Sequence, residues 1–224
     1  MGVRGAWPLF DLRIEAADLE LRVMRESDLQ LVSDSLPDDF EIDPMSTTYP
    51  GYGERMKRSL SVHQGYWKSF GSWSPEAWRL GFVVINQGRL IGFQELEGND
   101  FLRLSTVDSS SFLIPEFRGL GLGKQMREAV LTLAFGPLEA EAAITEAWRD
   151  NYASLGVSRS LGYRPNGEQM HRRGEGADVM IHLRLVRSDW IVQGRGEQVK
   201  ISGFDACRPL FGLAGDQRAD RIVK

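Results

Sequence analysis

The stretch SSSFLIPEFRGLGLGKQM, residues 109–126, decides the fold class of this chain of 224 residues. A β-rich run ends at Pro115, and a glycine-rich turn then opens a patterned helix that reaches about Phe135. The unpaired N–H groups and the dipole at a helix start attract anions. Glycines let the backbone approach phosphate oxygens closely, and Arg118 and Lys124 add charged donors. The segment therefore predicts a site for a phosphate-bearing ligand.

Two common phosphate-binding motifs do not match this turn. A Walker loop needs Ser or Thr after its Gly-Lys, and Gln125 stands there instead. The dinucleotide fingerprint needs Gly-x-Gly-x-x-Gly, whereas the glycines here alternate. The pattern that fits is Arg-x-x-Gly-x-Gly, formed by Arg118, Gly121 and Gly123. It resembles the coenzyme A pyrophosphate loop of the GCN5-related N-acetyltransferase (GNAT) superfamily.

The resemblance extends to other parts of the chain. DNYASLGVSRSLGY, residues 150–163, is similar to the second coenzyme A segment of the RimJ/RimL-like branch. WPLFDLRI (7–14) and GFDACRPLFG (203–212) are similar to an actinobacterial subgroup, some of whose members are linked to succinyl-CoA. The resemblance implies an enzyme with no tightly bound cofactor. Its acyl-CoA cosubstrate, acetyl-CoA or succinyl-CoA, would donate directly to a primary amine of a small molecule or a protein N-terminus. A non-catalytic acyl-CoA-binding module is the alternative.

Strand and helix patterns alternate along the whole chain. We expect helices at 29–36, 54–73, 119–135 and 151–161, and strands at 12–14, 19–23, 79–85, 90–96, 102–114, 142–148, 178–186 and 198–201. The alternation predicts an α/β or α+β class with a mixed sheet, and the resemblance implies a mostly antiparallel, twisted central sheet flanked by helices. Residues 1–187 would form the acyltransferase domain. Residues 188–224 would form a tail that packs on this domain or on a partner subunit.

The resemblance assigns the coenzyme A contacts residue by residue. The backbone of Ser111, Phe112 and Leu113 would lie at a splayed strand, where its N–H groups bind the pantetheine arm and the thioester oxygen. Asn151 and Ser154 would contact the same arm, although Asn151 also suits a simple helix cap. The pyrophosphate loop would comprise Arg118, Gly119, Leu120, Gly121, Leu122, Gly123 and Lys124.

Acyl transfer to an amine also needs a base and an acid. The amine arrives protonated and must lose a proton, and the leaving thiolate must gain one. The resemblance implies a base on the strand at 90–97, where a carboxylate faces the acceptor, and Glu95 is our candidate. Alternation places it beside Phe93 on one strand face, where its pKa would be raised. Glu97 and Asp108 compete with it. The resemblance implies that Ser154 supplies the hydroxyl that protonates the thiolate, and the phenol of Tyr152 is the second candidate acid.

Composition limits the other partners. Lys and Arg number 27 and Asp and Glu 31, a net charge of −4, so no nucleic-acid binding is expected. No apolar run approaches the roughly 20 residues of a membrane span, and the first residues lack a signal sequence, which indicates a cytoplasmic location. One cysteine, Cys207, and three scattered histidines predict no metal site.

Two further expectations concern the acceptor and assembly. The loop at 37–53 would govern the choice of acceptor, and its acidic residues Asp38, Asp39, Glu41 and Asp43 would attract a cationic amine. The strand at 198–201 would be a sheet edge that favours a homo-oligomer, such as a homodimer.

Overall fold

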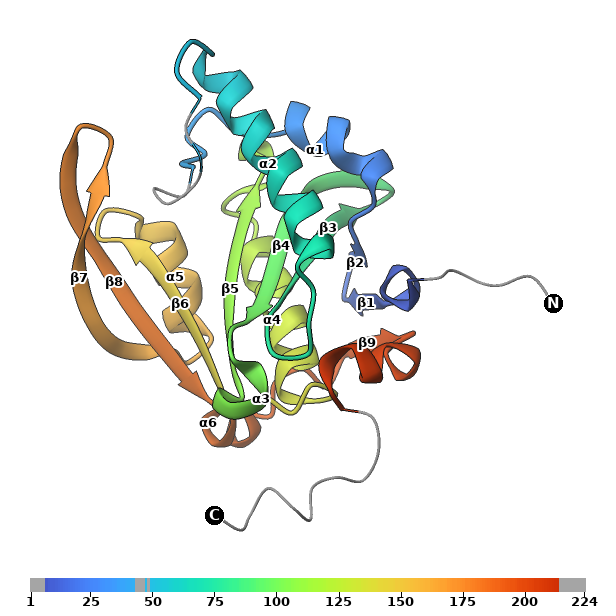
Figure 1. Ribbon diagram of the computed structural model, residues 1–224. Coiled ribbons are helices and arrows are strands. Elements are labelled where there is room, and N and C mark those ends of the chain that lie inside the picture. Colours follow the sequence, from blue (N-terminus) through green and yellow to red (C-terminus); the bar gives the residue numbers. More distant parts are fainter. Residues whose placement is uncertain (1–6, 43–46, 48, 214–224) are drawn as a thin grey trace.

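The computed structural model describes residues 7–42, 47 and 49–213. Nine strands form one sheet in the order β7-β8-β6-β5-β4-β3-β2-β1-β9 (Figure 1). All neighbours pair antiparallel except β5 and β6, which are parallel. The predicted mixed, mostly antiparallel sheet flanked by helices is confirmed. The strands are β1 Arg13–Ala16, β2 Leu19–Val23, β3 Trp78–Asn86, β4 Arg89–Gly98, β5 Thr106–Leu113, β6 Ala142–Trp148, β7 Arg164–Arg173, β8 Gly176–Val186 and β9 Val199–Ser202.

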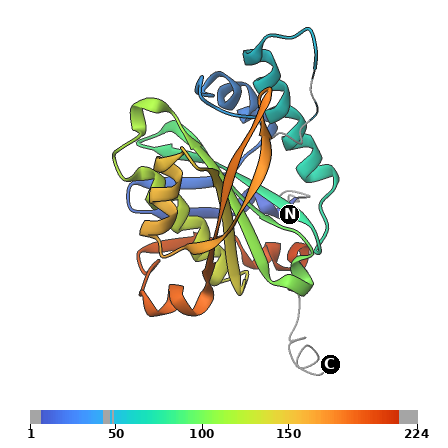
Figure 2. The ribbon, with the colours of Figure 1, turned by 90° about the vertical axis from the view of Figure 1, so that its left-hand side faces the viewer.

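Helices cover both faces of this sheet (Figures 1 and 2). The α-helices are α1 Leu29–Asp34, α2 Glu54–Gly71, α3 Phe101–Leu104, α4 Leu122–Phe135, α5 Tyr152–Ser160 and α6 Arg187–Val192. α4 packs the large core against one face, because its apolar positions recur every three or four residues. α1 and α2 close a smaller apolar cluster with β3, β4 and β5 on the other face. Within the described part of the chain, none of the helices combines the length and the apolar character that a membrane crossing requires.

The strand expected at 102–114 is wrong in its first part. Phe101–Leu104 forms the helical turn α3, and the strand begins only at Thr106. Asp100 and Ser105 flank the turn with φ of 49° and 44°, and Phe101 is buried against Trp78. Packing of this one aromatic ring overrides the strand propensity of its neighbours.

The sequence patterns predicted neither strand β7 nor helix α6. Nearly every β7 side chain is exposed, so the segment has no alternation of apolar and polar residues. β7 depends on its ladder with β8 instead.

The described part of the tail belongs to the same body. β9 pairs with β1 of its own chain, and Phe204, Cys207 and Phe211 are buried in the main core. Burial raises the pKa of the Cys207 thiol to about 11, which disfavours a nucleophilic thiolate.

Candidate active site

The parallel strands β5 and β6 separate in the middle of the sheet. Their ladder comprises three pairs and ends at Asp108↔Ile144. Beyond that point β5 stays paired with β4 as far as Leu113, and β6 stays paired with β8 as far as Trp148. Figure 1 shows β6 leaning away from β5 toward the β7–β8 hairpin. The β5 edge over 109–113 therefore has no ladder partner on this side among the described residues.

The three β5 residues expected at the pantetheine arm lie on this edge. Ser111 is exposed, whereas Phe112 is buried beside the rings of Phe40 and Phe93. Leu113 is half-buried next to the glycine turn. Because a β-strand backbone presents N–H groups regardless of side chain, the free edge can bind an amide-rich ligand in β fashion.

The glycine turn leads directly into α4. Gly119 and Gly121 have φ of 75° and 81°, a conformation that other residues rarely adopt. A Cβ placed on either would meet no atom within 4 Å, so the backbone faces open space. Leu120 is 65% exposed, and Lys124 is half-buried. The turn can therefore present its backbone N–H groups and the N-terminal end of α4 to an anion.

Arg118 already has an anionic partner. Its two terminal nitrogens donate to both carboxylate oxygens of Asp39 at 2.6 and 2.8 Å, and its Nε donates to the Leu113 carbonyl. These bonds hold the pKa of Asp39 below its usual range. Two residues along, Glu41 pairs with Arg173, which also holds Asp150. The segment with Asp39 and Glu41 thus connects the glycine turn to the β7–β8 hairpin.

The second predicted segment begins α5, which packs beside the glycine turn. Gly123 lies against Val157 of this helix and against Leu113. Asn151 caps α5, since its Oδ1 accepts the Ser154 N–H at 3.0 Å. The cap uses only the oxygen of the Asn151 side chain, which leaves the amide NH₂ available to a ligand. Ser154 is half-buried, whereas Tyr152 is 77% exposed.

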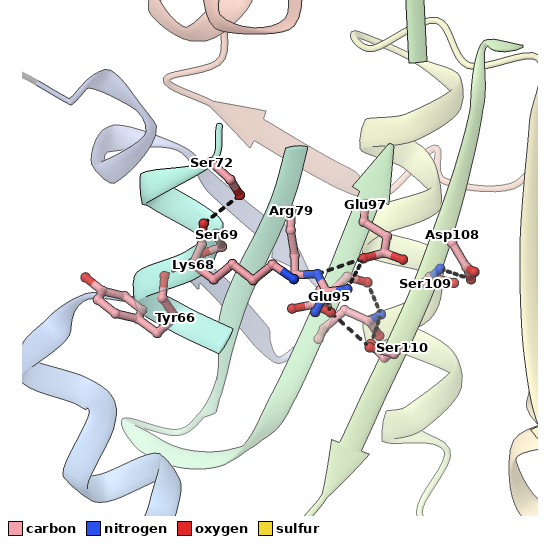
Figure 3. Close-up of polar contacts among 11 residues, drawn as sticks. Tyr66, Lys68, Ser69, Ser72, Arg79, Glu95, Glu97, Asp108, Ser109 and Ser110 are labelled. Atoms are coloured by element: carbon pink, nitrogen blue, oxygen red, sulfur yellow. Dashed lines mark hydrogen bonds and ion pairs between the residues drawn. The ribbon is translucent and has the colours of Figure 1, made fainter. Parts of the chain in front are cut away.

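Acidic side chains gather on the face of β4 and β5 that looks toward α2 (Figure 3). Glu97 lies opposite Asp108, and Glu95 lies opposite Ser110, whose hydroxyl contacts Glu95 at 3.4 Å. Arg79 on β3 binds Glu97 at 2.6 Å and approaches Glu95 at 3.6 Å. The alternation predicted for β4 is confirmed, because Gln94 and Leu96 are fully buried on the opposite face.

Two of these carboxyl groups titrate near neutrality. Burial raises the pKa of Glu95 to about 7, and the charge of Glu97 adds to this effect against the opposing charge of Arg79. Burial also raises the pKa of Asp108 to about 7, opposed by the backbone N–H of Ser109. A carboxylate with a pKa near the working pH suits a general base. Glu95 and Asp108 both meet this requirement.

Sequence reasoning missed a buried arginine behind the opening. Arg127 on α4 is 3% exposed and donates to Thr145 at 3.2 Å and to Ser111 at 3.4 Å. Thr145 in turn donates to the Ser109 carbonyl. These side chains bridge β5 and β6 where the ladder has stopped. The available signal was a charged residue inside the apolar stripe of a helix.

From the sequence, the three histidines were expected to be scattered, and this is wrong for two of them. His171 on β7 and His182 on β8 come together with Glu146 on β6, and their potential ligand atoms all lie within 4.8 Å of one another. Only strand pairing brings these residues together.

The raised pKa of Glu95 predicts a pH-dependent stability. The folded state binds the proton more tightly than the unfolded chain, so the stabilisation is complete below about pH 4.5 and is lost as the pH rises toward 7. A shift from 4.5 to about 7 corresponds to about 3 kcal/mol. In urea unfolding, the free energy of unfolding of the wild type should fall between pH 4.5 and 8 by about 3 kcal/mol more than that of Glu95→Gln.

A matched control is Glu15→Gln, which alters an exposed acid on β1. This variant should follow the wild-type pH curve. A Glu95→Gln curve parallel to that of the wild type would contradict the assignment.

The comparisons with known proteins agree with this geometry. A family model described as an acetyltransferase (GNAT) domain matches residues 18–164. RimJ of Mycobacterium smegmatis, solved with a CoA disulfide, superposes with a TM-score of 0.64 at 14% identity, over 86% of this chain and 98% of that one. RimL, a ribosomal L7/L12 α-N-protein acetyltransferase solved with coenzyme A, gives 0.60 at 15% identity, over 76% and 95%. A chimera of the Vibrio cholerae spermidine N-acetyltransferase SpeG and hSSAT gives 0.60 at 16%, over 78% and 99%.

Identities this low show likeness of fold, whereas the family model covers more than half of the chain. We conclude that this protein belongs to the GNAT acetyltransferase family of enzymes.

Proposed function

We propose that this protein transfers an acetyl group from acetyl-CoA directly to the primary amine of a small molecule or a protein N-terminus. One observation carries the proposal. The β5–β6 ladder stops after three pairs, and the freed β5 edge runs from beside Glu95, whose pKa is about 7, to the open glycine turn. This opening provides an unpaired strand edge, an anion site and a base within one region of the fold.

The residues divide the work as follows. The start of α4 and Arg118 bind the diphosphate of the coenzyme, and the free β5 edge over 111–113 binds the pantetheine arm. Backbone N–H groups of the same edge stabilise the charge that develops on the thioester oxygen. Glu95 takes a proton from the amine, directly or through a water molecule. The Ser154 or the Tyr152 hydroxyl returns a proton to the leaving thiolate.

The charge of the open face favours an acetyl donor and a cationic acceptor. Glu95, Glu97 and Asp108 lie on this face, and Arg79 is already paired with two of them. A succinyl carboxylate would meet these like charges, which is unfavourable in a partly buried site. A protonated amine is attracted by the same charges.

The first test is ligand binding followed by turnover. Acetyl-CoA at about 100 times its dissociation constant should stabilise the protein by about 2.7 kcal/mol and raise its melting temperature by several degrees. Succinyl-CoA, ATP and NADH serve as comparisons in the same thermal-shift assay. Release of free thiol with a panel of small amines and N-terminal peptides then measures transfer.

Each outcome of this test has a definite meaning. A shift with ATP and none with any coenzyme A species would overturn the assignment of the glycine turn. Binding of coenzyme A without turnover on any amine would support a non-catalytic acyl-CoA-binding module. A larger thermal shift and faster turnover with succinyl-CoA than with acetyl-CoA would show that the donor is succinyl-CoA.

Glu95→Gln tests the base. In the wild type, kcat/KM should rise with pH through an apparent pKa near 7, because only the ionised carboxylate accepts the proton. Glu95→Gln should lower kcat by about 100-fold or more and remove this limb of the pH profile.

Glu97→Gln is the matched control, since Glu97 lies on the same strand and face and is bound by Arg79. It should change kcat only slightly and move the limb to lower pH, because the charge of Glu97 raises the pKa of Glu95. Loss of the limb in Asp108→Asn but not in Glu95→Gln would assign the base to Asp108.

Asp39→Asn tests competition for Arg118. The coenzyme diphosphate and Asp39 require the same two guanidinium nitrogens. Removing the charge of Asp39 should therefore tighten coenzyme A binding several-fold in isothermal titration calorimetry. Glu41→Gln, which releases the same segment from Arg173, should leave this affinity within about twofold. Weaker binding in Asp39→Asn would show that Asp39 helps to hold the ligand instead.

A further inference from the structure

A cluster of two imidazoles and one carboxylate lies on the arm of the sheet formed by β6, β8 and β7. Glu146 and His182 are directly opposite each other in the β6–β8 ladder, and Glu146 Oε2 lies 3.2 Å from His182 Nδ1. His171 reaches the same place from β7, with its ring centroid 6.2 Å from that of His182. Three strands thus contribute one potential ligand each.

His171 shows that this cluster is incomplete as a hydrogen-bonded group. Its Nε2 is buried and has no hydrogen-bond partner among the described residues. A buried polar nitrogen without a partner is costly, and native structures rarely leave one unexplained. A cation bound through Nε2 would give this nitrogen a partner.

The donor set indicates which cation fits. Imidazole nitrogens favour zinc and its transition-metal neighbours over Mg²⁺ and Ca²⁺, which prefer oxygen ligands. Two histidines and one glutamate form a known zinc set, in which water takes the fourth position.

The distances also suit zinc. Ligand bonds of about 2.0–2.2 Å in a tetrahedral site place the donor atoms about 3.3–3.6 Å apart. The Glu146–His182 pair, at 3.2 Å, is close to this separation, and the three atoms lie within 4.8 Å of one another. Binding of the ion would draw these atoms closer together. The side chains of Glu146 and His182 are 45% and 28% exposed, so an ion can enter from solvent.

We propose that Glu146, His171 and His182 bind one Zn²⁺ ion, which ties the exposed β7–β8 hairpin to β6. The site shares no residue with the coenzyme A contacts proposed above, although the charge of Glu146 helps to raise the pKa of Asp108, and its test does not depend on acyl transfer. Because the ligands come from three strands, the bound ion favours the folded chain over the unfolded one.

The test uses untagged, full-length protein freed of metal with a chelator. Titration with zinc sulfate in competition with a chromophoric zinc chelator should show one ion per chain, and zinc should raise the melting temperature. His171→Asn and His182→Asn should each weaken binding by at least about tenfold. His63→Asn is the matched control, because His63 lies on α2 and bonds the Ser59 carbonyl. It should bind zinc like the wild type.

Absence of stoichiometric binding by the wild type would overturn the proposal, as would an equal loss in His63→Asn. A measurement on the wild type alone covers the case in which the strand variants fail to fold. Zinc K-edge absorption of the protein with one equivalent of zinc should show two imidazole nitrogens near 2.0–2.1 Å and no sulfur. A sulfur ligand would assign the ion to Cys207 and overturn the site.

Discussion

The early end of the β5–β6 ladder is the constraint on which the rest of the site depends. Parallel strands normally pair along their length, yet here only three residue pairs form before the strands diverge. The polar groups exposed by this separation need other partners. The Thr145 hydroxyl supplies one of them by donating to the Ser109 carbonyl, and Arg127 donates to that hydroxyl from inside. The remaining β5 edge leads into the glycine turn that begins α4.

The same separation divides the sheet into two arms with different tasks. The arm from β1 to β5, with β9 at its edge, carries the glycine turn and the raised-pKa carboxyl groups, and it shares the large core with β6 and β8. In the arm of β6, β8 and β7, the outermost strand β7 is mostly exposed. Asp39 and Glu41 connect the two through Arg118 and Arg173. A ligand that takes Arg118 from Asp39 would therefore release one of the contacts that join the two arms. A metal ion bound by Glu146, His171 and His182 would stiffen the second arm.

Much of the fold could be predicted because its elements have strong local patterns. The α4 stripe and the alternation of β4 are such patterns, and both predictions are confirmed. β7 has no alternation because neither of its faces is buried, and α3 exists because Phe101 packs under Trp78. Neither cause can be predicted from a short stretch of sequence, because both depend on contacts with other parts of the fold. In the candidate site, the position and face of Glu95 were predictable, whereas the buried Arg127 was missed despite its place in an apolar stripe.

The sequence by itself determined the glycine turn, the helix that follows it, the face of β4 that carries Glu95 and the resemblance to an acetyltransferase family that the family match confirms. Only the tertiary structure decided which residues become partners. It pairs Asp39 with Arg118, places Ser110 beside Glu95 and brings Glu146 together with two histidines. The physical reason is that periodicity places a residue on a face of its own element. The order and register of the strands then decide which residue of another element lies opposite it.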